Sequence, residues 1–113
     1  MSAGTRAEPS ARTAPRAEPR AERAERIGAA VRVLPGVAGL TAGPRGYVVT
    51  YRPGPPYEGV AVRDGEIEVG VVARAGLPLE EVAESVRRAA RPLAGDVPVN
   101  VLIGDIAYGG PPG

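Results

Sequence analysis

The sequence predicts an α+β fold in which a small mixed sheet of roughly four to five strands carries two helices on one face. Two segments place apolar residues at the spacing of an amphipathic helix, and several shorter segments alternate apolar and polar residues. Asp64-Gly65 separates two of the alternating segments, which indicates a β-hairpin. In chain order the elements run α-β-β-β-α-β, and such a sheet buries its apolar face by packing both helices against it.

The first helix is expected from about Ala21 to Leu34. Its apolar stripe, at positions i, i+3, i+4 and i+7, consists of Ile27, Ala30, Val31 and Leu34. Pro35-Gly36 follows directly, and both residue types are typical of a helix end. The stripe is narrow and contains no large side chain, so we expect it to face the core rather than a membrane surface.

Two strands are expected before the hairpin. Val37–Thr41 is the weaker candidate because it contains Gly39, whereas Tyr47–Tyr51 is rich in the β-branched and aromatic residues that favour strands. Gly43–Gly46 between them predicts a turn. The proline-rich segment Pro53–Pro56 is then expected to end the strand.

Residues 60–63 and 66–74 predict the two strands of the hairpin. The Asp-Gly loop favours a type I′ turn, in which both central residues take positive φ. The apolar face of the second strand consists of Ile67, Val69, Val71 and Ala73. Glu66 and Glu68 share the opposite face, where we expect solvated carboxylates rather than an acid–base pair.

The second helix is expected to begin at about Pro78, since proline suits the first helical turn. Its buried stripe consists of Leu79, Val82, Ala83, Val86, Ala90 and Leu93. Pro92 is expected to end or distort the last turn, with Gly95 as the C-cap. The final strand is expected at Val97–Ile106, which again alternates apolar residues.

The folded domain is expected to span residues 21–106. Residues 1–20 repeat the motif Arg-Ala-Glu-Pro imperfectly, and no Val, Leu, Ile or aromatic residue occurs before Ile27. Such a segment cannot bury enough apolar surface to offset its ordering entropy, so we expect a disordered tail. Residues 107–113 are expected to form a flexible C-terminal end.

The composition argues against catalysis. The chain contains no Cys and no His, which excludes thiol and imidazole chemistry and the zinc sites built from these residues. We therefore expect no enzymatic activity, no cofactor and no metal site. The net charge of +1 gives no strong attraction to nucleic acids or anionic membranes. No apolar run approaches the ~20 residues of a membrane span, and no signal-peptide pattern is present, so a cytoplasmic protein is expected.

The candidate partner surface consists of Arg45, Tyr47, Tyr51, Arg52 and Tyr57. Tyr and Arg are enriched in protein interfaces, but the same residues also suit stacking on single-stranded nucleic acid. Half-buried packing is a third interpretation. Gly43–Gly46 has the GxxG spacing of the nucleotide-binding loop of KH domains, although that loop requires a helix on each side. The sequence leaves these alternatives open.

Four segments together resemble the alkaline shock protein family of Gram-positive bacteria. They are Ile27–Leu40 (IGAAVRVLPGVAGL), Val60–Gly76 (VAVRDGEIEVGVVARAG), Leu77–Gly95 (LPLEEVAESVRRAARPLAG) and Val97–Ile106 (VPVNVLIGDI). Ala75 stands where the family often has an aromatic residue, and Leu79 separates Pro78 from the glutamates that commonly follow it directly. The tail and the segment from Tyr47 to Pro56 fall outside the resemblance.

The resemblance implies a non-enzymatic cytoplasmic protein, a scaffold or interaction protein in the envelope stress response. It also implies association with the membrane through a small membrane-anchor protein, without direct insertion, and association with paralogues or with a second copy. No catalytic residues are carried over. The alternative hypothesis is a KH-like RNA-binding module that uses the Arg-rich tail together with Tyr47 and Tyr51.

Overall fold

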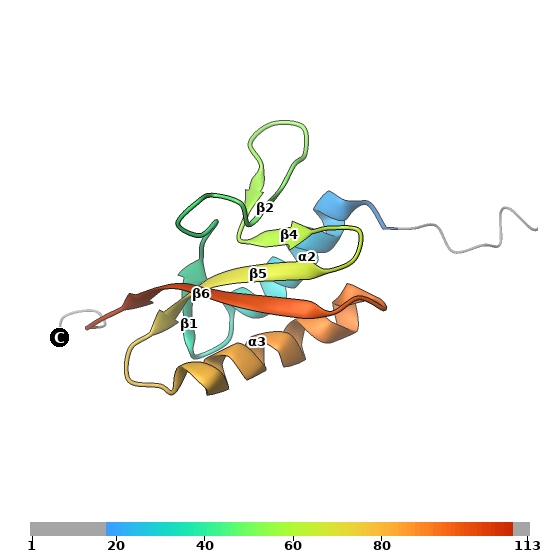
Figure 1. Ribbon diagram of the computed structural model, residues 1–113. Coiled ribbons are helices and arrows are strands. Elements are labelled where there is room, and N and C mark those ends of the chain that lie inside the picture. The colour runs from blue at the N-terminus through green and yellow to red at the C-terminus, as the bar shows by residue number, and fades with distance from the viewer. Residues whose placement is uncertain (1–17, 110–113) are drawn as a thin grey trace, which may run out of the picture.

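The computed structural model describes residues 18–109 and shows an α+β domain with two helices and a mixed sheet, which confirms the fold class (Figure 1). The elements are α2 (Arg20–Arg32), β1 (Val37–Leu40), β2 (Val49–Thr50), β3 (Tyr57–Glu58), β4 (Val60–Val62), β5 (Ile67–Arg74), α3 (Leu79–Ala94) and β6 (Val99–Ala107). Most of the expected tail, residues 1–17, and residues 110–113 of the expected C-terminal end lie outside the described residues. Arg20 already belongs to the first helix.

The central strand of the larger sheet is β5. It pairs antiparallel with β1 and with β4, and parallel with β6. Because β6 follows β5 along its whole length, from Ile67 to Arg74, β1 and β4 share the other edge of β5. The parallel pair is joined through α3, as a parallel connection requires a long crossover. A separate small sheet of β2 and β3 lies outside this arrangement.

The core lies between the sheet and both helices. The predicted apolar face of β5 is fully buried, with 0% exposure at Ile67, Val69, Val71 and Ala73. From α2 the core receives Ala24, Ile27 and Val31, and from α3 it receives Val82, Val86, Ala90 and Ala94. Both helices therefore cover the same face of the sheet, as predicted. Each buried Val or Ile contributes about 1.5–3 kcal/mol, and these residues supply most of the core because the chain lacks Phe and Trp.

Three details of the helices and of the last strand differ from the expectation. Leu79 is 41% exposed rather than buried, because it is the first residue of α3 and lies at the rim of the core. The helix continues through Pro92 to Ala94 before Gly95, with φ of 76°, ends it. The final strand begins at Val99 rather than at Val97.

The hairpin is present, but its turn is not of type I′. The Arg63 N–H donates to the Glu66 carbonyl at 2.9 Å, which closes a two-residue loop between β4 and β5. Gly65 does not take the positive φ that a type I′ turn requires. The expected strand Tyr47–Tyr51 is also reduced to Val49–Thr50, which pairs with β3 instead of joining the larger sheet.

Candidate interaction surfaces

The five residues of the predicted partner surface divide into two groups. Arg52 and Tyr57 are half-buried against α2, whereas Tyr47 and Tyr51 are 68% and 81% exposed. Arg45 is exposed as well and lines a hollow of about 260 Å³ next to Tyr47. The five residues therefore have different surroundings, and whether they bind a partner together stays a prediction.

Tyr57 and Arg52 fasten the β2–β3 sheet to α2. The Tyr57 hydroxyl accepts a hydrogen bond from Arg32 at 3.2 Å and lies so close to Gly28 that a Cβ at position 28 would force Tyr57 to shift. The Arg52 guanidinium is 5.3 Å from the centroid of the Tyr57 ring, within the range of a cation–π contact. It also pairs with Glu25 of α2 at 2.5 Å. These contacts are packing, the third interpretation that the sequence left open.

Tyr47 and Tyr51, which lie before and after β2 in the chain, are brought together at one cavity. Both line an open cavity of about 540 Å³, together with Arg20 and Arg63. The remaining lining residues are Gly46, Val49, Thr50 and Val62. We call Tyr47, Tyr51, Arg20 and Arg63 the tyrosine surface. It combines two exposed aromatic rings with two guanidinium groups in one concave site.

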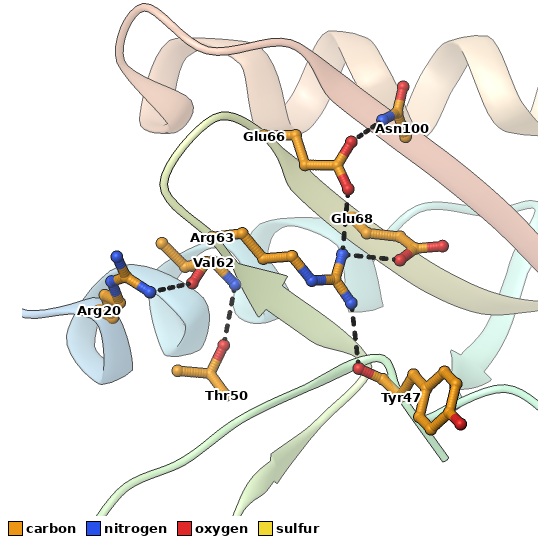
Figure 2. Close-up of polar contacts among 8 residues, drawn as sticks. All are labelled: Arg20, Tyr47, Thr50, Val62, Arg63, Glu66, Glu68 and Asn100. Carbon is orange, nitrogen blue, oxygen red and sulfur yellow. Dashed lines mark hydrogen bonds and ion pairs between the residues drawn. The ribbon is translucent and has the colours of Figure 1, made fainter. Parts of the chain in front are cut away.

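Arg63 holds the chain at Tyr47 in place (Figure 2). Its Nη2 donates to the Tyr47 carbonyl oxygen at 3.1 Å, while Nη1 donates to Glu68 at 2.8 Å and to Glu66 at 3.2 Å. Glu66 in turn accepts a hydrogen bond from Asn100 of β6 at 2.6 Å. Glu66 and Glu68 are thus bridged by a guanidinium rather than solvated independently. The sequence pattern identified the two carboxylates on one face of the strand, but it did not identify Arg63 as the side chain that bridges them.

The outer edge of β4 is closed by side chains (Figure 2). The Thr50 hydroxyl accepts a hydrogen bond from the Val62 N–H at 3.0 Å and donates to the Val60 carbonyl at 2.7 Å. Arg20 donates to the Val62 carbonyl at 3.3 Å and also pairs with Asp64. The backbone groups that a neighbouring strand would use are therefore occupied. The tyrosine surface lies directly beside this closed edge.

The opposite edge of the sheet is different. Within residues 18–109, β6 pairs with no strand other than β5, so no strand covers its outer edge. Near its end, a shallow hollow of about 300 Å³ is lined by Leu79 and by residues 103–106 of β6, which include Asp105. Tyr108, directly after the strand, is 78% exposed and lines the same hollow. Sequence reasoning missed this edge, although the lack of charge from Val97 to Ile103 is visible in the printed sequence.

Other site types find little support among residues 18–109. No three or more Asp and Glu side chains of that part lie where they could together hold a metal ion. In the same part, no helix has the length and apolar character to cross a bilayer. The GxxG segment Gly43–Gly46 forms a turn between β1 and β2, with the Gly46 N–H donating to the Gly43 carbonyl at 3.1 Å. It therefore lacks the helix on each side that a KH loop needs.

Comparisons with known proteins find no counterpart: no family model, no curated protein and no solved structure matches this chain.

Proposed function

We propose that this protein is a non-enzymatic interaction module, a scaffold of the alkaline shock type that acts in envelope stress homeostasis. In this proposal it is cytoplasmic and reaches the membrane by binding a small membrane-anchored protein. The observation that carries the proposal is the tyrosine surface, in which two largely exposed tyrosines share one cavity with Arg20 and Arg63. The resemblance of residues 27–106 supplies the cellular context.

The chemistry of this surface suits a protein partner. Tyrosine buries a large area with few rotatable bonds, and Tyr and Arg dominate the residues that matter most for affinity in protein interfaces. The Arg63 contact to the Tyr47 carbonyl fixes the backbone, so less ordering is needed on binding. The cavity, about 540 Å³, can take one or two side chains of a partner segment.

An RNA partner is less well supported. Arg63, the guanidinium at the centre of the surface, already contacts both Glu66 and Glu68. These carboxylates offset the positive charge that a phosphate backbone would need. Arg20 is likewise paired with Asp64. We therefore favour a protein over a nucleic acid as the partner of this surface.

The test uses the full chain and a matched pair of variants. Tyr47→Ser with Tyr51→Ser should abolish recovery of a membrane-anchored partner from host membranes, and should weaken binding to that partner once it is purified. Tyr108→Ser, which removes an equally exposed tyrosine elsewhere, should leave binding unchanged. Equal binding by all three proteins would contradict the proposal. Tight binding of a single-stranded RNA oligomer that weakens steeply with salt, and is lost in the double variant, would replace it with the RNA hypothesis.

A further inference from the structure

The open edge of β6 is unusual among the edges of this sheet. The edge of β4 is closed by Thr50 and Arg20, and β1 is only four residues long with an irregular register between Val37 and Gly39. By contrast, β6 is nine residues long and its sole strand partner among residues 18–109 is β5. Long open edges recruit further strands unless charge, proline or irregularity protects them. Protection of β6 is present in only one half of the strand.

The protected half lies towards the C-terminus. The register between β5 and β6 shifts between Val71 and Val72, where β6 contains one additional residue at Gly104. The neighbouring Asp105 is the one charged side chain in the strand. A bulge and a charge both discourage edge pairing. The half from Val99 to Ile103 has an unbroken register with β5 and carries no charge.

In the half from Val99 to Ile103, every second residue points its backbone N–H and C=O groups away from β5. The Ile67 N–H donates to the Pro98 carbonyl at 2.9 Å. In this register the backbone N–H and C=O groups of Asn100 and Leu102 point towards β5. In a parallel ladder the residues between them point their N–H and C=O groups away from the partner strand. Val99, Val101 and Ile103 therefore present their backbone groups at the open edge. The pattern is symmetric about Val101.

We propose that a second copy of this chain binds the edge, with the two β6 strands antiparallel and the two-fold axis at Val101. In this register Val101 faces its own counterpart, and Val99 faces Ile103 of the other copy. Each of these pairs exchanges two backbone bonds, so all three outward residues are satisfied with about six hydrogen bonds. On the other face Asn100 lies opposite Leu102.

Charge and symmetry favour a second copy over an unrelated strand. In an antiparallel pair of identical strands, each side chain faces a residue of the same sequence running in the opposite direction. A charged residue in that sequence can therefore face a like charge, which is destabilising. The segment Val97–Ile103 contains no charged residue, so self-pairing brings no like charges together. The bulge at Gly104 ends the pairing on both sides of the axis and so limits it to one register.

Such a dimer leaves both tyrosine surfaces accessible. They lie beside β4, on the far side of β5 from β6, and Figure 1 shows β2 and its loop on the opposite side of the fold from α3 and β6. Two copies joined through β6 would therefore present two tyrosine surfaces at the two ends of one continuous sheet. This arrangement would make the module bivalent, which strengthens attachment to a clustered partner. The dimer does not depend on the proposed function, since it uses a different edge.

Proline substitutions provide a matched test in the full chain. Val101→Pro removes an N–H that points outward and leaves the ladder with β5 intact, so the monomer should fold. Because the N–H is lost in both copies, the dimer dissociation constant should rise by roughly tenfold or more. Ile106→Pro is the control, since it lies in the same strand beyond the bulge and outside the proposed register. Both are measured by analytical ultracentrifugation, with circular dichroism to verify folding.

Cross-linking gives a second measurement that does not depend on proline. The chain contains no Cys, so Asn100→Cys introduces a single thiol. In the proposed register the two thiols are diagonal neighbours, with Cβ atoms about 7–8 Å apart, and a short bis-thiol reagent should join them. Ala38→Cys, at the exposed position of β1, should give no such product. A wild-type chain that stays monomeric at millimolar concentration, or equal cross-linking of the two variants, would overturn the proposal.

Discussion

The Thr50 hydroxyl lies 3.0 Å from the Val62 N–H and 2.7 Å from the Val60 carbonyl, so one side chain satisfies two backbone groups at the edge of β4. Thr50 is 5% exposed, so water does not readily replace these bonds. These two hydrogen bonds explain why Tyr47–Tyr51 does not add a strand to the larger sheet. The side chain of Thr50, rather than its backbone, occupies the position of the next strand.

Thr50→Val should therefore destabilise the fold by about 1–3 kcal/mol, because it keeps the shape of the side chain but leaves one buried and one partly buried backbone group unpaired. Thr50→Ser keeps the hydroxyl and should lose less. Urea unfolding of the three proteins measures the difference. Equal midpoints for the valine variant and the wild type would show that the two bonds contribute nothing to stability.

The contact between Gly28 and Tyr57 predicts an overpacking effect in α2. A Cβ at position 28 would lie 2.0 Å from the Tyr57 hydroxyl oxygen and 2.8 Å from the ring carbon Cζ. Gly28→Ala should cost about 1–3 kcal/mol despite the higher helix propensity of alanine, because Tyr57 must move away from α2. Gly39→Ala, where no atom lies within 4 Å of the new Cβ, is the control and should change little.

A double-mutant cycle identifies the cause. If the clash with Tyr57 is responsible, Gly28→Ala should cost far less in a Tyr57→Ala background than in the wild type. Thermal unfolding of the four proteins gives the coupling. Additive effects would mean that Gly28 is needed for another reason, such as the packing of α2 on the sheet.

The elements with strong periodicity could be predicted from the sequence. The alternation in β5 and the helical stripe of α3 each report burial on one face, and Ile67, Val69, Val82 and Val86 are buried as the pattern requires. The prediction that Leu79 is buried is wrong, because periodicity gives the direction of a side chain and not its distance from the end of the core. Burial falls off at the first turn of a helix whatever the pattern.

The candidate site could be predicted only in part, because its contacts join residues far apart in the sequence. The exposure of Tyr47 and Tyr51 fits a surface, but the same residue type at Tyr57 packs against Gly28, and nothing local separates the two cases. The role of Arg63 depends on β5, through Glu68, and the separate chain segment at Tyr47 meeting at one guanidinium. Likewise, the open edge of β6 follows from the parallel pairing with β5, which the crossover through α3 determines.

Glu18 should give the protein a small, pH-dependent gain in stability. Hydrogen bonds from Arg26, at 3.0 Å to both carboxylate oxygens, hold the pKa of Glu18 below its ordinary value of 4.5, with Arg23 adding to the effect at 3.5 Å. A carboxyl whose pKa is lower in the folded state stabilises the fold above its unfolded pKa, and this contribution is lost as the pH falls through the folded value.

Glu18→Gln should therefore lower the unfolding temperature slightly at pH 7, and the difference from the wild type should disappear in strongly acidic solution. Glu58→Gln removes the same charge from an exposed position that makes no ion pair among residues 18–109, and serves as the control. Scanning calorimetry from neutral to acidic pH measures both variants. A difference between Glu18→Gln and the wild type that stays constant with pH would exclude the carboxylate as its source.

Arg63→Met should separate the stability of the fold from the order of the tyrosine surface. Methionine retains an apolar stem but loses the contacts to Glu66, Glu68 and the Tyr47 carbonyl. Since Arg63 is 37% exposed, the loss of the ion pairs should cost only about 1 kcal/mol or less, and less still at high salt. Partner binding should fall more than stability does, because the backbone at Tyr47 is no longer fixed before binding.

Arg87→Met provides the comparison for this variant, since Arg87 forms an exposed ion pair with Glu84 on α3, away from the tyrosine surface. Its stability should decrease by a similar amount, while its affinity for the partner stays at the wild-type value. Urea unfolding gives the first quantity and isothermal titration calorimetry gives the second. If both variants bind with wild-type affinity, the preorganisation of Tyr47 by Arg63 is not part of recognition, and the tyrosine rings act without it.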